Sequence, residues 1–409
     1  MHPKKGNWPI ADNIYNRGEK CKELQNELVG LRREFHQIPE LGDNLPETQA
    51  RVCAELDKMG IPYKKNTIDS GIIALIDGGN PGKTIALRAD MDALPITEAT
   101  GLPFASKHEG KMHACGHDTH ITMLLGAAKV LNENKANLKG KVKLIFQTGE
   151  ETCTGSKNML KEGVLENPHV DAVFGMHIGS IIDPKIPAGK VIVTPGCCMA
   201  SYDHFILTVT GTGCHGSTPE KGVDPIVVAS NIVLALEEVI AREVASTKAA
   251  VITIGQIHAG FAYNVIPNEV VIEGTTRALE EDVRQYLGKR IGEIAESVAK
   301  AYRAECKYEM LWGAAPVVND PEMAKLAADA AVKVVGADNV ITSRPAPNMA
   351  GEDFAYYLME RPGAFMFLSS ANPDKHTDIP HHNPKLDVDE DVLWNGSAVF
   401  VSIVQDYLK

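Results

Sequence analysis

The sequence lacks two features that would assign it to whole classes of protein. Basic residues do not outnumber acidic ones: 41 Lys and Arg stand against 53 Asp and Glu, so the formal net charge is -12. A nucleic-acid-binding protein needs a basic surface for phosphates, so we expect no nucleic-acid partner. The sequence also has no apolar run near the roughly 20 residues that a membrane-spanning helix needs, so we expect no membrane partner.

An export signal is missing as well. The segment Met1–Glu19 is polar and has neither the apolar core nor the small-residue cleavage site of a signal peptide. Cysteines are sparse, 8 in 409 residues, and only Cys197 and Cys198 are adjacent. In a chain without an export signal, such cysteines are expected to be reduced thiols rather than a disulfide framework. Both observations predict a cytoplasmic protein.

Most of the chain alternates between strand-like and helix-like patterns, without low-complexity tracts or repeats. Residues 20–60 have apolar positions at helical spacing. Further along, strands are predicted at 71–77, 83–89, 141–147, 171–176 and 363–368, and helices at 119–132, 156–162, 320–335 and 352–360. This alternation predicts an α/β domain with a mostly parallel sheet and helices on both faces.

The middle of the chain has a different order of elements. Strands and helices are predicted in the order β-α-β-β-α-β, at 203–210, 225–238, 249–256, 269–276, 280–302 and 305–310. That order is typical of the ferredoxin-like arrangement. We therefore predict that residues 200–312 form an inserted α+β domain, and that residues 1–199 and 313–409 together form the larger domain.

Residue types that bind metals follow several of the predicted strands. Asp90 and Asp92 come after one strand, Glu150-Glu151 after the next, and His177 after a third. Because ligands of open α/β sheets gather outside the carboxyl ends of the strands, we expect these side chains to converge. In the glutamate pair, one carboxylate can bind a metal while its neighbour takes a proton from water.

The densest cluster of such residues is the segment 113–120, which contains three histidines, Cys115 and Asp118. A helix cap formed by Asp118 or Thr119 would explain one of these residues but not all five. Imidazole together with thiolate suits zinc, cobalt, nickel or a related ion rather than magnesium or calcium. A second histidine pair, His381-His382, lies between two prolines, where a surface turn is the alternative. Together the clusters hold enough donors for two ions about 3.5–4 Å apart.

Taken in order, these motifs resemble the amidohydrolase branch of the aminoacylase/carboxypeptidase metallopeptidase family. That branch includes hippurate hydrolases, indole-acetyl-amino-acid hydrolases and N-acetyldiaminopimelate deacetylases. The resemblance runs from about Arg32 to the end of the chain and rests on the segments 32–36, 39–40, 88–95, 113–120, 146–151, 176–177, 213–217, 222–225, 264–267, 274–277, 351–354 and 382–384. It implies a di-metal catalytic domain of mostly parallel α/β fold, an inserted ferredoxin-like lid and dimerisation domain, and a homodimer.

The resemblance also implies roles for individual residues. It implies two divalent ions per subunit, zinc, manganese, cobalt or nickel, with five ligands: Cys115, His117, Glu151, His177 and His382. Glu150 is then the general base, Asp92 a carboxylate that orients a ligand, and His215 a hydrogen-bond donor to the developing oxyanion. Asn264 and Arg277 are then substrate contacts. The implied reaction is hydrolysis of the amide bond of an N-acyl amino acid or a small peptide-like conjugate.

Two other functions remain open from the residues alone. A thiol amidase could use Cys115 activated by His117, although the two glutamates, His177 and His382 would then have no role. The second open function is that of a non-catalytic protein that binds an amino-acid derivative. The chain also departs from many relatives at Thr148-Gly149 and in the segment 152–155 that follows the paired glutamates. Both segments line the expected site, so the resemblance implies the class of reaction rather than the substrate.

Overall fold

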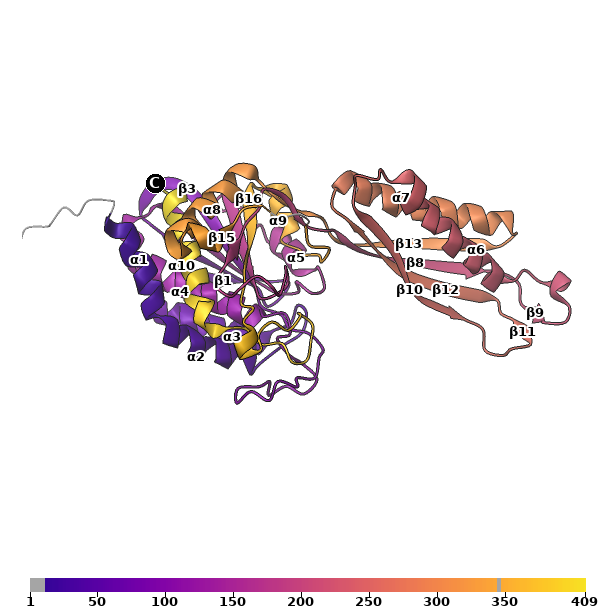
Figure 1. Cartoon of the computed structure of the whole chain (residues 1–409), viewed down its shortest axis with the longest axis horizontal. Coiled ribbons are helices and arrows are strands. Elements are labelled where there is room, and N and C mark those ends of the chain that lie inside the picture. Colours follow the sequence, from indigo (N-terminus) through magenta and orange to yellow (C-terminus); the bar gives the residue numbers. More distant parts are fainter. Residues whose placement is uncertain (1–11, 344–346) are drawn as a thin grey trace, which may run out of the picture. The chain divides into compact units, whose positions relative to one another are not determined.

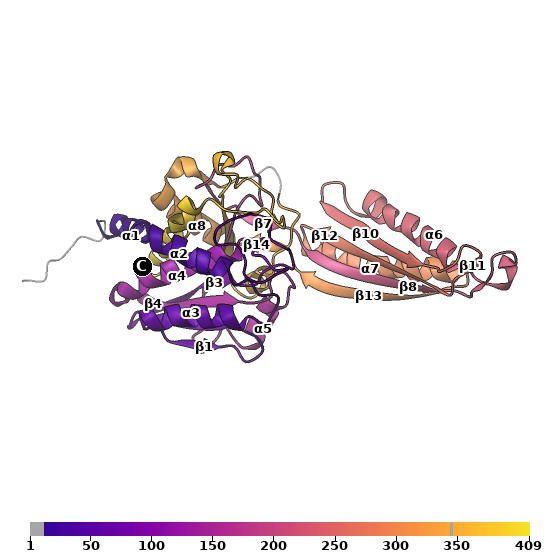
Figure 2. The ribbon, with the colours of Figure 1, turned by 90° about the horizontal axis from the view of Figure 1, so that it is seen from below.

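The computed structural model describes residues 12–343 and 347–409, which divide into two compact units (Figures 1 and 2). The larger unit contains residues 12–196, 318–343 and 356–409, and the smaller unit contains residues 197–317 and 347–355. Residues 1–11 of the polar N-terminal segment lie outside the described residues. Within the described ranges, no helix is long and apolar enough to span a bilayer.

The larger unit is built on an eight-stranded sheet with the order β1-β2-β4-β3-β5-β16-β6-β15. Its strands are β1 (Tyr63–Lys65), β2 (Ile72–Asp77), β3 (Asn80–Asp90), β4 (Lys139–Gln147), β5 (Ala172–Ile178), β6 (Val191–Ile192), β15 (Val340–Ile341) and β16 (Gly363–Leu368). The central strands β4, β3, β5 and β16 are parallel, whereas β1, β2 and β6 pair antiparallel with a neighbour. The predicted mostly parallel α/β sheet is confirmed.

The helices of the larger unit are α1 (Asp12–Glu23), α2 (Gln25–His36), α3 (Pro46–Met59), α4 (His117–Glu133), α5 (Gly155–Lys161), α8 (Pro321–Val335), α9 (Ala355–Glu360) and α10 (Leu393–Tyr407). The helical region predicted over residues 20–60 is therefore divided. Pro39 follows α2 closely and cannot continue a helix, and Pro46 begins α3 with its fixed φ angle. Helix α4 is buried along almost its whole length and packs against β3, α2 and α10.

The smaller unit is a four-stranded antiparallel sheet with the order β10-β12-β8-β13. Its elements are β8 (Tyr202–Thr210), α6 (Pro225–Glu238), β10 (Ala250–Ala259), β12 (Glu269–Ala278), α7 (Glu281–Ala301) and β13 (Glu305–Ala314). Strand β12 lies between β8 and β10 and pairs antiparallel with both, so those two strands are parallel to each other. This is the predicted ferredoxin-like arrangement.

One face of this small sheet is covered by the two helices. Phe205, Leu207 and Val209 alternate along β8 and are fully buried against side chains of α6 and α7. The residues between them face the opposite side and are half-exposed. Two short ladders complete the topology, β9 (Cys214–His215) with β11 (Val265–Ile266), and β7 (Gly196–Met199) with β14 (Val317–Asn319).

Candidate active site

Donor atoms for metals gather in the larger unit. Five groups among the described residues have their ligand atoms within 4.8 Å of one another, and three of them consist of expected site residues: Cys115–His117–His177, Cys115–Glu151–His382 and His117–Glu150–Glu151. The other two are Asp90–His117–His120 and Glu150–Glu352–Asp353. The structure therefore brings together all five side chains that were expected to bind metal, with the expected general base beside two of them. They come from the loop before α4, the first residue of α4, the loop after β4, strand β5 and the segment before α10.

The start of α4 places the first two donors. Gly116 is the N-cap of this helix, with φ +85°, so Cys115 lies in the preceding loop and His117 is the first helical residue. A Cβ atom on Gly116 would lie 2.9 Å from Cγ2 of Ile178, so this close approach requires glycine. The alternative explanation of this segment, a helix cap at Asp118 or Thr119, does not hold, because the helix begins at His117.

The ring of His117 is held in a definite orientation. Its Nδ1 lies 2.8 Å from the backbone carbonyl oxygen of Asp92, which can only accept, so Nδ1 carries a proton. The buried Nε2 has no hydrogen-bond partner among the described residues. Burial alone would lower the pKa of His117, but the carboxylates of Asp90 and Asp92 raise it to about 10. The same negative field favours a metal cation at Nε2.

His177 and Cys115 form the second part of the cluster. Nδ1 of His177 donates to the backbone carbonyl of Ile178 at 2.7 Å, which leaves Nε2 facing the Cys115 sulfur at 3.4 Å. The sequence predicted that His177 follows its strand. In the structure, His177 lies inside β5, because the strand continues to Ile178. Burial, with Glu151 and Glu150 nearby, raises the pKa of the Cys115 thiol well above its usual value. Without a cation, this side chain is therefore a neutral thiol.

The chain segment before α10 supplies the last donor. The backbone N–H of His382 donates to the carbonyl of Ala114 at 2.8 Å, which fixes this segment against the Cys115 loop. The His382 backbone has a φ of +61°, in the left-handed region. Its Nε2 lies 3.4 Å from Oε1 of Glu151, and 53% of its side chain is exposed. His382 therefore lies on the open side of the cluster.

Asp92 connects three residues of the site. Its carboxylate accepts the backbone N–H groups of Glu150 at 3.0 Å and Glu151 at 3.1 Å. Its carbonyl oxygen contacts Nδ1 of His117 at 2.8 Å, whereas the carboxylate is 3.6 Å from that nitrogen. Asp92 therefore fixes the glutamate loop through its carboxylate and the imidazole through its backbone.

Sequence reasoning missed a buried polar layer beneath these donors. The carboxylate of Asp90 contacts Nη1 of Arg88 at 2.7 Å and Nδ1 of His120 at 2.5 Å. Nε2 of His120 accepts the backbone N–H of Ile178 at 2.9 Å, so both ring nitrogens are occupied. His120 also forms a candidate donor group with Asp90 and His117, but both of its ring nitrogens already have partners within the protein. Its contacts with Asp90 and Ile178, which form only in the folded chain, distinguish it from His117.

The smaller unit carries the other expected site residues. The pairing of β9 with β11 sets His215 opposite Val265, and the Asn264 carbonyl accepts the Gly216 N–H at 2.8 Å. Nδ1 of His215 accepts the Ser217 N–H at 3.1 Å and lies 2.7 Å from the Ser217 hydroxyl. A backbone N–H can only donate, so the ring proton is on Nε2. His215 and Asn264 are therefore neighbours, with a donor nitrogen free to meet a ligand.

Arg277 occupies a separate place in the smaller unit, near the end of β12. Its guanidinium carbon lies 4.3 Å from the centre of the Tyr202 ring. Nη1 donates to the Thr275 hydroxyl at 2.5 Å and to the Thr276 carbonyl at 2.9 Å. These contacts fix the plane of the guanidinium, which suits bidentate binding of a carboxylate.

The chemistry of the donor set fits a transition-metal centre. Thiolate, imidazole and carboxylate together are typical ligands of zinc and related divalent ions. Both imidazoles of the inner cluster are held by a backbone carbonyl at Nδ1, which leaves Nε2 of His117 and His177 directed at the other donors. Such outer contacts are typical of metal-binding histidines.

Comparison with known proteins agrees with this geometry. Residues 86–406 match the model of peptidase family M20/M25/M40. The chain is 40% identical to N-acetyl-L-cysteine deacetylase of Bacillus subtilis, over 91% of this chain and 86% of that protein. It is 37% identical to an IAA-amino acid hydrolase of Arabidopsis thaliana, over 95% of this chain and 88% of that protein.

A solved structure extends the likeness to three dimensions. A dinuclear metal-binding peptidase of the M20 family from Bacillus subtilis superposes with a TM-score of 0.80 and 34% identity, covering 95% of this chain and 99% of that chain. The family model spans most of the chain, and the first two relatives hydrolyse amides of amino acids by name. The chain therefore belongs to peptidase family M20/M25/M40 and is a metal-dependent hydrolase of the amide bonds of N-acyl amino acids or small peptide-like conjugates.

Proposed function

We propose that this enzyme removes the acyl group from N-acyl amino acids that keep a free carboxylate, using two divalent ions per subunit. The observation that carries the proposal is the position of Glu150. Its carboxylate lies within 4.8 Å of the donor atoms of His117 and Glu151, and the N–H groups of both glutamates are held by Asp92. One glutamate is thus available as a base while its neighbour binds metal.

In the proposed reaction each side chain has one task. The metals would be held by Cys115, His117, Glu151, His177 and His382. When bound, they supply the positive charge that activates water and polarises the scissile carbonyl. Glu150 takes the proton of the attacking water and passes it to the leaving amine. Nε2–H of His215 donates to the oxyanion that develops on the carbonyl oxygen.

A substrate screen tests this proposal. The metal-free enzyme is reloaded with zinc, manganese, cobalt or nickel and assayed on N-acetyl, N-benzoyl and indole-acetyl amino acids and on dipeptides. We expect chelator-sensitive hydrolysis of at least one N-acyl amino acid. Bound metal with no turnover across the whole panel would support a non-catalytic binding protein instead.

The structure weakens the case for a thiol amidase. A nucleophilic cysteine needs a lowered pKa, so that the thiolate forms near neutral pH. Burial and the two nearby glutamates act in the opposite direction at Cys115. A reduced Cys115 is nevertheless required to bind metal, which agrees with a reducing compartment, and we propose that the enzyme is cytoplasmic.

Arg277 is proposed to bind the carboxylate of the amino-acid product. Arg277→Ala should reduce kcat/KM for N-acyl amino acids by about 10-fold or more, because a charge-assisted hydrogen bond contributes about 1.5–3 kcal/mol. The matching N-acyl amino-acid amides lack the charge and should lose much less. Steady-state kinetics on matched acid and amide pairs measures the difference. Equal losses on both would instead indicate that Arg277 supports the sheet through Tyr202 and Thr275.

We propose that residues 1–199 and 313–409 form the catalytic domain and that residues 200–312 form a lid and dimerisation domain. Strand β10 is an edge strand whose only described partner is β12. The loop after it exposes 85% of Phe261 and all of Tyr263, which are large apolar side chains beside an open edge. Such edges invite pairing with another chain, and closed two-fold dimers are the commonest assembly. A second copy of this chain is the proposed occupant.

The dimer is proposed to deliver His215 to the active site of the partner. Mixing inactive His215→Ala protein with inactive Glu150→Gln protein then restores activity, because one site of each mixed dimer has neither defect. Random exchange would give on the order of a quarter of the parental activity. Mixed dimers are verified with two affinity tags. If verified mixed dimers stay inactive, His215 acts within its own chain.

A further inference from the structure

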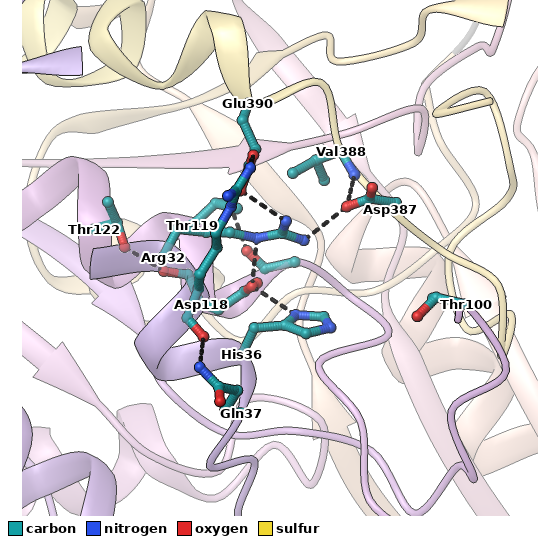
Figure 3. A network of polar contacts seen from close by, with 12 residues as sticks. Arg32, His36, Gln37, Thr100, Asp118, Thr119, Thr122, Asp387, Val388 and Glu390 are labelled. Carbon is teal, nitrogen blue, oxygen red and sulfur yellow. Dashed lines mark hydrogen bonds and ion pairs between the residues drawn. The ribbon is translucent and has the colours of Figure 1, made fainter. Parts of the chain in front are cut away.

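The motif Arg32–His36, near the end of α2, takes no part in the proposed reaction, although its two terminal residues are buried. Arg32 is 1% exposed and His36 is not exposed at all. Nε of Arg32 and Nδ1 of His36 both contact Oδ2 of Asp118 at 2.8 Å (Figure 3). Asp118 is itself fully buried and is the next residue after His117 in α4.

The same guanidinium also contacts the segment before α10. Its Nη2 donates to Oδ1 of Asp387 at 2.9 Å, and its Nη1 donates to Oε1 of Glu390 at 3.1 Å. Figure 3 shows Arg32 between these carboxylates and Asp118. Asp387 follows His382 in this segment by five positions. One side chain therefore connects the two stretches of chain that present His117 and His382.

Electrostatics keep this cluster charged. Burial alone would lower the pKa of Arg32, but Asp118, Asp387 and Glu390 raise it. Asp118 is fully buried and meets both Arg32 and His36 at 2.8 Å, so its carboxylate has two partners inside the cluster. A buried ion cluster of this kind is costly to form and strongly disturbed when one partner is removed. It therefore fixes relative positions of α2, α4 and the C-terminal segment.

We propose that Arg32 is a positioning residue of the metal centre, which holds the His117 and His382 segments at the spacing that metal binding needs. The inference rests on the proposed ligand roles of these two histidines. The forked guanidinium contacts three carboxylates at once, whereas the single ammonium of a lysine cannot reproduce that arrangement. Arg32→Lys keeps the charge and removes the fork, so it isolates geometry.

The test measures the metal affinity of the full-length protein in the oligomeric state in which it is purified. Metal-free Arg32→Lys protein is titrated with zinc and with manganese against a competing chelator, and its melting temperature is measured without metal. We expect metal affinity to fall by about 10–100-fold, as for other outer contacts of metal ligands. Activity should return toward the parental value when metal is supplied in excess.

The chain offers a matched control in the smaller unit. Arg284 is 4% exposed and pairs with the fully buried Asp203 through Nε at 2.8 Å and Nη2 at 2.7 Å. Arg284→Lys disturbs a comparable buried ion pair that includes no residue of the metal cluster. It should lower the melting temperature and leave metal affinity at the parental value. A purely structural Arg32 would behave like Arg284, and parental metal affinity in folded Arg32→Lys would overturn the inference.

Two further variants keep the test decisive. If Arg32→Lys does not fold, Asp387→Asn is the substitute, because it removes the charge of one of the three carboxylates that contact Arg32, at a side chain that is 24% exposed. It should weaken metal affinity several-fold, and unchanged affinity would again overturn the inference. His382→Ala is titrated in parallel. If His382→Ala binds metal as the parent does, the ligand assignment fails. If His382→Ala loses metal affinity but the Arg32 and Asp387 variants bind metal as the parent does, the inference about Arg32 fails and the ligand assignment stands.

Discussion

Replacing Glu150 by Gln should abolish most turnover while leaving metal bound. The amide has the size and shape of the carboxylate but cannot accept the proton of the attacking water. General acid–base catalysis contributes about 10²–10⁴-fold, and the loss in kcat should reach or exceed that range. Glu150 is 8% exposed and its N–H is held by Asp92, so the substitution should not change the loop. Single-turnover kinetics and elemental analysis on the same sample measure both quantities.

The neighbouring glutamate provides the matched control. Glu151→Gln is one residue away, on the same loop, with its N–H held by the other oxygen of Asp92. This change removes a proposed ligand, so metal content and turnover should fall together. The role assignment is wrong if Glu150→Gln keeps most of its turnover. If the two variants show the same metal loss, the distinction between base and ligand fails.

Much of the fold could be predicted because apolar residues recur at a different spacing in strands than in helices. Strand Gly363–Leu368 and helix Pro225–Glu238 have the predicted bounds, and the other predicted strands are present with ends that differ by one to four residues. The residues that were misplaced lie at those ends. His177 was expected after its strand and lies inside β5, since the apolar pattern does not show where backbone pairing with β16 stops.

The donor atoms of the site could also be predicted, and so could Asp92, whereas Arg32 and the contacts of His120 could not. Cys115, His117 and Glu151 carry a chemical signal in their side chains and their clustering. Arg32 carries no such signal, because an arginine in an amphipathic helix is ordinary, and within the 113–120 cluster the sequence does not distinguish the role of His120 from that of His117. The importance of Arg32 and His120 arises from Asp118 and Asp90, which are distant in the sequence and meet them only in the folded chain.

Removing a proposed ligand should have the second large effect. Cys115→Ala deletes the only sulfur donor of the two groups that contain it. The remaining imidazoles and carboxylates cannot replace the lost thiolate ligand. Metal affinity should therefore fall by more than the 10–100-fold that is typical when a residue that only orients a ligand is replaced. Metal content after dialysis and kcat should fall together. His382→Ala should act in the same direction without opening the core, because its side chain is half-exposed.

The pH dependence of metal binding gives an independent check on Cys115. Burial raises the pKa of this thiol, so a metal that binds it as thiolate must displace a proton. Metal binding by the parent should therefore release one more proton per subunit than binding by Cys115→Ala, measured by calorimetry in buffers of different ionisation enthalpy. Cys53→Ala is the control, because Cys53 is 5% exposed against 6% for Cys115 and lies on α3, outside the donor groups. It should keep the parental metal content and proton release. Stoichiometric metal in purified Cys115→Ala, with the parental number of protons released, would show that this sulfur is not a ligand.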